Sequence, residues 1–236
     1  MTYFVISDIH GYYKAMRQSL QKAGYNENNP HHHLIVIGDM FDRGPSSDQV
    51  LEYLYPLFQE NKASIIIGNH DTFLRDFLQG DNSRVLFNVM YNGFQATLEA
   101  LSNTSFTEDS LDSIRTKIHR RYPYLQSLLE NVPYFIEKGD YIFVHGGIDG
   151  GALDWRTMLS EHDYVWSREH QLPPIPGKTV VAGHTRVATI RKRTTSYELL
   201  FLHHPEYFDI LYMEGKILID RFVEVAQELN VLVLDM

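Results

Sequence analysis

The sequence predicts an α/β fold that contains mixed β-sheets. Short apolar runs rich in β-branched residues recur along the whole chain, and helical patterns separate the first of them. Alternation of strands with helices is typical of α/β proteins, and the strand-rich pattern of the last forty residues favours mixed strand directions. The expected strands are Tyr3–Ile6, Leu34–Ile37, Ser64–Ile67, Tyr141–Val144, Thr179–Ala182, Lys216–Ile219 and Val231–Leu234.

The spacing of apolar residues distinguishes the first strands from the helices between them. Leu34–Ile37 (LIVI) is apolar at every position, which predicts a strand covered on both faces. Tyr13–Ala23 has a helical pattern instead. In Ser46–Gln59, apolar residues recur at helical spacing behind a Pro-Ser-Ser start, which predicts a second helix.

Residues 94–131 have a different character from the rest of the chain. They contain no convincing strand, and Leu111, Ile114 and Ile118 mark one amphipathic helix among charged residues. A length of 236 residues suits one large domain. We therefore expect a single domain over residues 1–236, with a helical insertion or cap at about 94–131.

The composition argues against several classes of protein. A net charge of −9 disfavours binding to nucleic acid or to an anionic membrane, because both need a basic face. No apolar stretch reaches the length of a membrane span, and the first residues have no signal-peptide pattern. The absence of cysteine excludes disulfides and thiolate metal sites. We expect a cytoplasmic protein.

Polar side chains follow five of the expected strands at the point where each strand ends. The segments are VISDIHG, VIGDMFDRG, IIGNHD, FVHGG and VAGHT, and each has a glycine close to the polar residues. In α/β sheets the carboxyl ends of the strands form the site, and glycine allows the chain to turn sharply there. The candidate residues are Asp8, His10, Asp39, Asp42, Arg43, Asn69, His70, His145 and His184.

Six of these side chains suit a pair of divalent metal ions. Two aspartates, one asparagine and three histidines offer oxygen and nitrogen donors without sulfur, as Mn²⁺, Fe and Zn²⁺ accept. Six ligands are too many for one tetrahedral ion but suit two ions, about 3.5–4 Å apart, that share a bridging carboxylate. Mn²⁺ is the ion expected in vitro, with Fe or Zn²⁺ as alternatives.

The ordered motifs D-x-H-G, G-D-x-x-D-R-G, G-N-H-D, H-G-G and G-H resemble those of the metal-dependent phosphoprotein phosphatases, small bacterial-type branch, within the calcineurin-like metallophosphoesterases. The resemblance extends from Asp8 to His184. It implies a four-layer sandwich of two mixed β-sheets flanked by helices, with a dinuclear metal site at the sheet edge. The implied ligands are Asp8 and His10 for one metal, Asn69, His145 and His184 for the other, and Asp39 as the bridge.

The resemblance also implies roles for residues that do not bind metal. His70 matches a general acid and Asp42 the carboxylate that orients it; imidazole suits the task because it titrates near neutral pH. Arg43 matches a phosphate-binding arginine, and Arg168 in the segment VWSREH resembles a second. Asp71 departs from the pattern, since many eukaryotic members have glutamate there.

Three functions remain open at this point. The main expectation is hydrolysis of phosphomonoesters by a bacterial-type serine/threonine protein phosphatase, acting on a phosphorylated protein or a small phosphate ester. The alternative is a dinucleoside polyphosphate (diadenosine tetraphosphate) hydrolase. The pairing of Asp42 with His70 favours monoesters, because an alkoxide leaving group needs a proton more than a nucleotide does. A non-catalytic scaffold that binds phosphorylated partners is the third possibility. The sequence does not indicate an oligomeric state.

Overall fold

The computed structural model describes all 236 residues and contains nine strands in two sheets. The first sheet has the order β3-β2-β1-β9 and the second the order β4-β5-β6-β8-β7. The other strands of each sheet are parallel, while β9 at one edge of the first sheet and both edge strands of the second sheet, β4 and β7, are antiparallel. The strands are β1 Thr2–Ile6, β2 His32–Ile37, β3 Ala63–Ile66, β4 Phe135–Lys138, β5 Tyr141–Val144, β6 Thr179–Ala182, β7 Leu211–Met213, β8 Lys216–Leu218 and β9 Leu232–Asp235.

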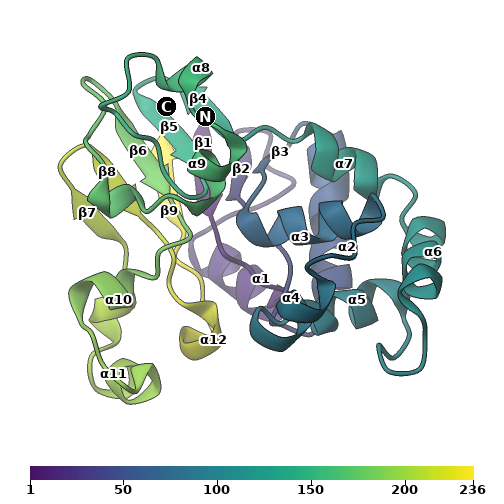
Figure 1. Ribbon diagram of the computed structural model, residues 1–236. Helices are drawn as coiled ribbons and strands as arrows, with labels where there is room; N and C mark the ends of the chain where they lie inside the picture. Colours follow the sequence, from purple (N-terminus) through teal and green to yellow (C-terminus); the bar gives the residue numbers. More distant parts are fainter.

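The two sheets pack face to face, and helices and loops cover their outer faces (Figure 1). Val5, Ile35 and Ile37 of the first sheet join Phe143 and Val181 of the second in one buried apolar cluster. Their neighbours along β1 and β2 point the other way and pack with the helices. Because both faces are covered, these strands are apolar at almost every position. The predicted α/β sandwich of two mixed sheets flanked by helices is confirmed.

Most of the helices lie in two groups, apart from α1, α8 and α9 (Figure 1). The helices α2 to α7 gather beside the first sheet, and α10 to α12 gather beyond the ends of the second sheet. No helix combines the length and the apolar character that crossing a membrane requires. The helices are α1 Tyr13–Lys22, α2 Ser47–Gln59, α3 Asn69–Leu78, α4 Val85–Tyr91, α5 Phe94–Ser102, α6 Leu111–Arg121, α7 Leu125–Asn131, α8 Trp155–Met158, α9 Glu161–Trp166, α10 Val187–Arg191, α11 Tyr197–His203 and α12 Val223–Ala226, with 3₁₀ turns η1 Glu169–Gln171 and η2 Pro205–Phe208.

Residues 94–131 form three helices and no strand, as the sequence indicates. The expected apolar stripe belongs to α6, where Ile114 and Ile118 are buried and Leu111 is half-buried. That this segment is an insertion into a single domain stays a prediction.

Two strands escaped the sequence analysis. Both β4 and β7 are antiparallel edge strands that pair with one neighbour each. The residues of β4 are all half-buried, so no apolar run marks the strand. The strand-rich pattern expected for the last forty residues is only partly right, because α11 and α12 also lie there.

Candidate active site

The structure brings all ten predicted site residues to one edge of the two sheets. The five strands β1, β2, β3, β5 and β6 end there, and they are parallel within each sheet, so the turns that follow them converge. A cavity of about 390 Å³ opens at this edge. Asp8, His10, Asp39, Arg43, Asn69, His70, Arg168 and His184 line it, while Asp42 and His145 are buried behind its wall.

The turns of the site hold strained backbone conformations. Ten residues other than glycine have a positive φ angle, and six of them are predicted site residues: Asp8, His10, Asp39, Asp42, Arg43 and His184. A side chain in this region of φ costs about 1–3 kcal/mol and persists only where the surroundings enforce it. The strain is therefore concentrated at the turns that aim polar side chains into the cavity.

Asp39 lies at the centre of the cluster. Its Oδ1 is 3.3 Å from Nε2 of His145, and its Oδ2 is 3.7 Å from Nε2 of His10. Two groups of potential ligand atoms share it, one with His10 and His70 and the other with His145 and His184; within each group all atoms lie within 4.8 Å of one another. The two oxygens of one carboxylate thus face two separate sets of imidazoles, which is the arrangement of a bridging ligand.

Two of the histidines are oriented by main-chain carbonyl groups. His10 Nδ1 donates to the carbonyl oxygen of Phe41 at 2.9 Å, and His145 Nδ1 donates to that of Ile37 at 3.0 Å. These bonds direct both Nε2 atoms toward Asp39, as the outer hydrogen bonds of metal-binding histidines do. His184 Nε2 is buried and has no hydrogen-bond partner in the protein. An unpartnered buried nitrogen costs free energy, which a metal ion would recover.

The charges of the cluster also suit a cation. Burial and the nearby Asp220 raise the pKa of Asp8 well above its usual range. Burial alone would raise the pKa of Asp39, but His145 and His70 hold it well below the usual value. Burial opposes a charge on His145 as well, yet Asp39 raises its pKa to about 10. The buried carboxylates thus favour a positive charge beside them, which divalent ions would supply.

The imidazoles of His10 and His184 are kept neutral, so their nitrogen lone pairs are available to bind metal ions. Burial lowers the pKa of His10 well below its usual value, with Arg43 adding to the effect. Burial and the neighbouring His145 lower the pKa of His184 to about 3. Neutral imidazole is the form that binds metal ions. The donor set and its burial therefore fit two divalent ions, and His145, whose pKa Asp39 raises, would release its proton on binding one.

His70 and Asp42 form a buried pair beside the cluster. His70 Nδ1 is 2.7 Å from Asp42 Oδ2, and Asp42 Oδ1 accepts from Thr97 Oγ1 at 2.9 Å. Thr97 Oγ1 also accepts from the backbone nitrogen of Asp42 at 2.7 Å. Burial raises the pKa of Asp42, and its hydrogen bond with His70 opposes that rise. Because Thr97 belongs to α5, the helical segment 94–131 supports this pair directly, which the sequence analysis did not foresee.

Asp71 organises the two turns around Asp39. Its carboxylate accepts from the backbone nitrogens of Asp39, Met40 and Gly68 at 2.8–2.9 Å. A β-carbon on Gly68 would lie 2.3 Å from Asp39 Oδ1, so only glycine allows this approach. The sequence analysis had treated Asp71 only as a departure from a motif, although an aspartate two residues after Asn69 was the available signal.

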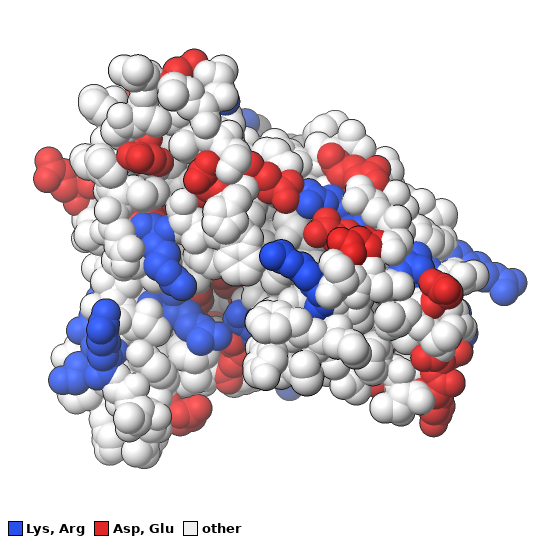
Figure 2. All heavy atoms as spheres, in the orientation of Figure 1, with Lys and Arg blue, Asp and Glu red and all other residues white.

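Arginines form the rim of the cavity, and Figure 2 shows positive side chains around the hollow on this face. Arg43 donates to His10 Nε2 at 2.6 Å, to His70 Nε2 at 3.0 Å and to Glu224 at 2.8 Å. A metal ion on His10 Nε2 would use the lone pair that accepts from Arg43, so metal binding there and the hydrogen bond between Arg43 and His10 exclude each other. Arg168 reaches Thr185 at 3.5 Å.

Arg186 is a third arginine of the cavity, and the sequence analysis missed it. It donates to the same oxygen of Glu224 at 2.7 Å, and its guanidinium lies 3.7 Å from the centre of the Phe222 ring. Its position two residues after His184 was the only signal. Glu224 lies on α12, far along the chain, and no motif marks it.

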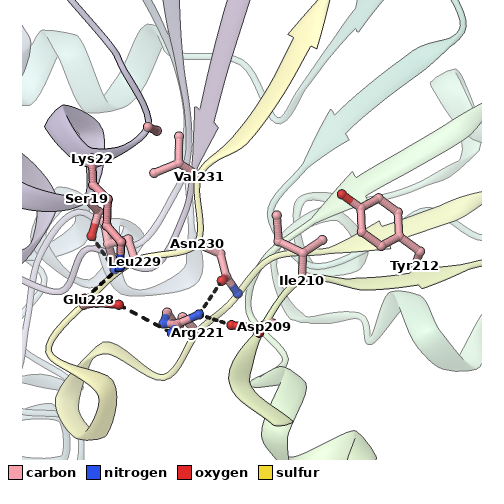
Figure 3. A pocket seen from close by; sticks show the side chains of 11 residues that line it. Ser19, Lys22, Asp209, Ile210, Tyr212, Arg221, Glu228, Leu229, Asn230 and Val231 are labelled. Atoms are coloured by element: carbon pink, nitrogen blue, oxygen red, sulfur yellow. Dashed lines mark hydrogen bonds and ion pairs between the residues drawn. The ribbon is translucent and has the colours of Figure 1, made fainter. Parts of the chain in front are cut away.

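A second cavity of about 410 Å³, between α1 and the C-terminal loops, is not part of this site (Figure 3). Its charged side chains pair with one another. Arg221 contacts Asp209 and Asn230 and lies 3.4 Å from Glu228, which also lies 3.3 Å from Lys22. No set of potential metal-binding side chains lines it.

Comparison with known proteins gives the chain a family. The model of the calcineurin-like phosphoesterases matches residues 1–232. Two asymmetrical bis(5'-nucleosyl)-tetraphosphatases PrpE are similar in sequence: that of Bacillus velezensis is 30% identical over 156 residues, and that of Anoxybacillus flavithermus is 32% identical over 161 residues. These matches cover 63% and 65% of this chain, but only 57% and 60% of the relatives.

A shorter stretch resembles a symmetrical enzyme. The symmetrical bis(5'-nucleosyl)-tetraphosphatase of Buchnera aphidicola is 44% identical over 70 residues, which is 30% of this chain and 24% of that protein. Among solved structures, a cold-active protein tyrosine phosphatase has a TM-score of 0.58 at 17% identity, over 99% of this chain and 73% of that one. That likeness concerns the fold alone. The family match confirms the class of enzyme expected from the sequence, a metal-dependent phosphoric ester hydrolase: the chain belongs to the calcineurin-like phosphoesterase family.

Proposed function

We propose that this protein hydrolyses dinucleoside tetraphosphates with the help of two divalent metal ions. The single observation that carries the metal-dependent reaction is Asp39, whose two oxygens face two separate sets of buried imidazoles. The choice of substrate rests on the similar bis(5'-nucleosyl)-tetraphosphatases and on the arginines of the rim. This choice sets aside a protein phosphatase, which was our main expectation from the sequence, in favour of the alternative, a dinucleoside polyphosphate hydrolase.

The ligand residues would hold the two ions in the positions that the resemblance implies. When bound, the ions neutralise the anionic substrate and activate the attacking water. Asp39 would serve both ions, and the carbonyl groups of Phe41 and Ile37 keep the Nε2 atoms of His10 and His145 turned toward it. The remaining ligands are Asp8, Asn69 and His184.

The residues beside the ligands would handle protons and phosphate. His70 would donate a proton from Nε2 to the leaving oxygen once that nitrogen is protonated and released from its hydrogen bond with Arg43, and Asp42 holds the imidazole in the orientation that this transfer needs. Arg43 and Arg168 bind the reacting phosphate through their planar guanidinium groups. Arg186 adds a third guanidinium at the rim, so the cavity offers positive charge for more than one phosphate group.

A phosphomonoester substrate remains the second candidate because of one observation. The buried pair of His70 and Asp42, at 2.7 Å, suits protonation of a poor leaving group such as serine alkoxide. A nucleotide leaves with less help from an acid.

Product analysis with defined substrates tests the proposal. We expect the protein loaded with Mn²⁺ to cleave diadenosine tetraphosphate with a kcat/KM about 100-fold above that for phosphoserine peptides, given how strongly a complementary site discriminates. Chromatography would distinguish ATP plus AMP from two ADP. A chelator should abolish turnover, and Mn²⁺ should restore it. A higher kcat/KM for the phosphopeptides would refute the proposed substrate class.

A further inference from the structure

A third, smaller cavity adjoins the arginine-lined active site. It encloses about 310 Å³ between Phe73 of α3, the helix α4 with the turn before it, and Trp166. Trp166 and Asn92 line both cavities. A substrate bound at the strand ends can therefore extend past these two residues into the smaller cavity.

The wall of the smaller cavity combines aromatic rings with amides. The rings of Phe73 and Trp166 are 6.0 Å apart, and Phe87 of α4 also lines the space although 57% of it is exposed. Asn88 is buried in the wall and accepts a hydrogen bond of 2.8 Å from Asn92. Flat rings offer stacking surfaces, and amides can pair with the polar edge of a heterocycle.

The smaller cavity also differs from the site in charge. Arg84 is its only charged residue, whereas three arginines, two aspartates and three histidines line the site. Phosphate groups therefore belong in the site, and an uncharged aromatic group belongs in the smaller cavity. Such a group attached to a chain of phosphates is what a nucleotide provides.

We propose that the cavity lined by Phe73, Phe87 and Trp166 binds a nucleobase of the substrate. This inference rests on the proposed function and deepens it, because it names the part of the substrate that is recognised beyond the phosphates. The base stacks against the exposed ring of Phe87 and the indole of Trp166, and Asn88 and Asn92 face its polar edge.

Two small ligands that differ only in the base provide the test. AMP and ribose 5-phosphate share the sugar and the phosphate, so a difference in their binding reports on the base. The chain has two tryptophans, and Trp155→Phe leaves Trp166 as the only indole fluorophore. In this background, loaded with Mn²⁺, we expect AMP to quench the fluorescence and to bind about 10-fold more tightly than ribose 5-phosphate.

Two substitutions on one helix then locate the effect. Phe87→Ala should weaken AMP binding about 10-fold and leave ribose 5-phosphate binding unchanged. Met90→Ala is the matched control, because Met90 lies on the same helix, is 67% exposed and does not line the cavity. Equal affinities for the two ligands, or equal effects of the two substitutions, would overturn the proposal.

The outcome separates this inference from the function on which it rests. Preferential binding of AMP without cleavage of diadenosine tetraphosphate would retain the base site and reject the proposed function. Cleavage of diadenosine tetraphosphate without preferential binding of AMP would retain the function and reject the base site.

Discussion

The floor and the rim of the active site are built in opposite ways. The floor consists of the polar residues that follow the five strand ends, and Asp8, His10, Asp39, Asp42 and His145 there are at most 2% exposed. The rim consists of Arg43, Arg168, Arg186 and Glu224; Arg43 is 25% exposed, Arg186 32% and Glu224 20%. Floor residues have fixed partners and strained turns, whereas rim residues share a few contacts near solvent.

The difference indicates what each part can do. A strained, buried floor fixes its groups within narrow limits, as metal binding and proton transfer require. A partly exposed rim adds binding energy and selects the substrate, and its contacts can change without disturbing the chemistry. Changes in the floor should therefore reduce kcat, and changes in the rim should mainly raise KM.

The largest effect is expected from Asp39→Asn. Loss of one carboxylate charge should reduce kcat/KM for diadenosine tetraphosphate by more than about 100-fold, because even the outer partners of metal ligands are each worth 10–100-fold. Metal content, measured by mass spectrometry after gel filtration, should fall as well. Asp48→Asn removes a carboxylate charge as well and is the control, because Asp48 lies on α2, 3.6 Å from Arg121, and does not line the active site. Normal turnover and metal content in Asp39→Asn would refute the role of Asp39 as the bridge.

His70→Asn should have the next largest effect, and its size should depend on the leaving group. A general acid contributes about 10²–10⁴-fold to a reaction whose leaving group needs a proton. We expect a loss in that range for an alkyl phosphate and a much smaller loss for an aryl phosphate. Equal losses for the two substrates would mean that His70 acts as a ligand, as its place in the cluster with His10 and Asp39 also allows.

Arg186→Gln tests the rim. We expect KM for diadenosine tetraphosphate to rise about 10-fold with kcat nearly unchanged, since a charged hydrogen bond to a phosphate is worth about 1.5–3 kcal/mol. Arg193→Gln provides a control in an exposed loop. If kcat falls as far as it does in His70→Asn, the distinction between floor and rim is wrong.

The smallest effect concerns the support of Arg168. The next residue, Glu169, is buried, accepts from the backbone nitrogen of Ile148 at 2.8 Å, and lies 3.5 Å from the buried Lys216. Burial raises the pKa of Glu169 from 4.5 to about 7. Between pH 4.5 and about 7, Glu169 therefore keeps a proton in the folded state that it has lost in the unfolded state. Its contribution to stability falls as the pH rises through this range and is constant above it.

Glu169→Gln removes that titration. We expect the variant to lose less stability, relative to the parent, at pH 8 than at pH 5. Urea denaturation at the two pH values measures the difference. A difference between variant and parent that is independent of pH would show that Glu169 is ionised throughout.

The sequence predicted the central strands because both of their faces are covered. Leu34–Ile37 is apolar at each position, and burial on both sides leaves no position for a polar residue. The strands β4 and β7 pair on one side only and carry no such mark. Thr97 could not be predicted as a partner of Asp42, since 55 residues separate the two and only the packing of α5 brings them together.

By itself, the sequence determined which chemistry is available, because oxygen and imidazole donors stand beside sharp turns at five strand ends. Parallel strands of a sheet end at the same edge, so these donors converge. Only the tertiary structure decided that one carboxylate faces two sets of imidazoles, that Arg186 and Glu224 reach the rim, and that an aromatic cavity adjoins it. Local patterns fix local conformation, whereas contacts between distant segments depend on how the layers pack.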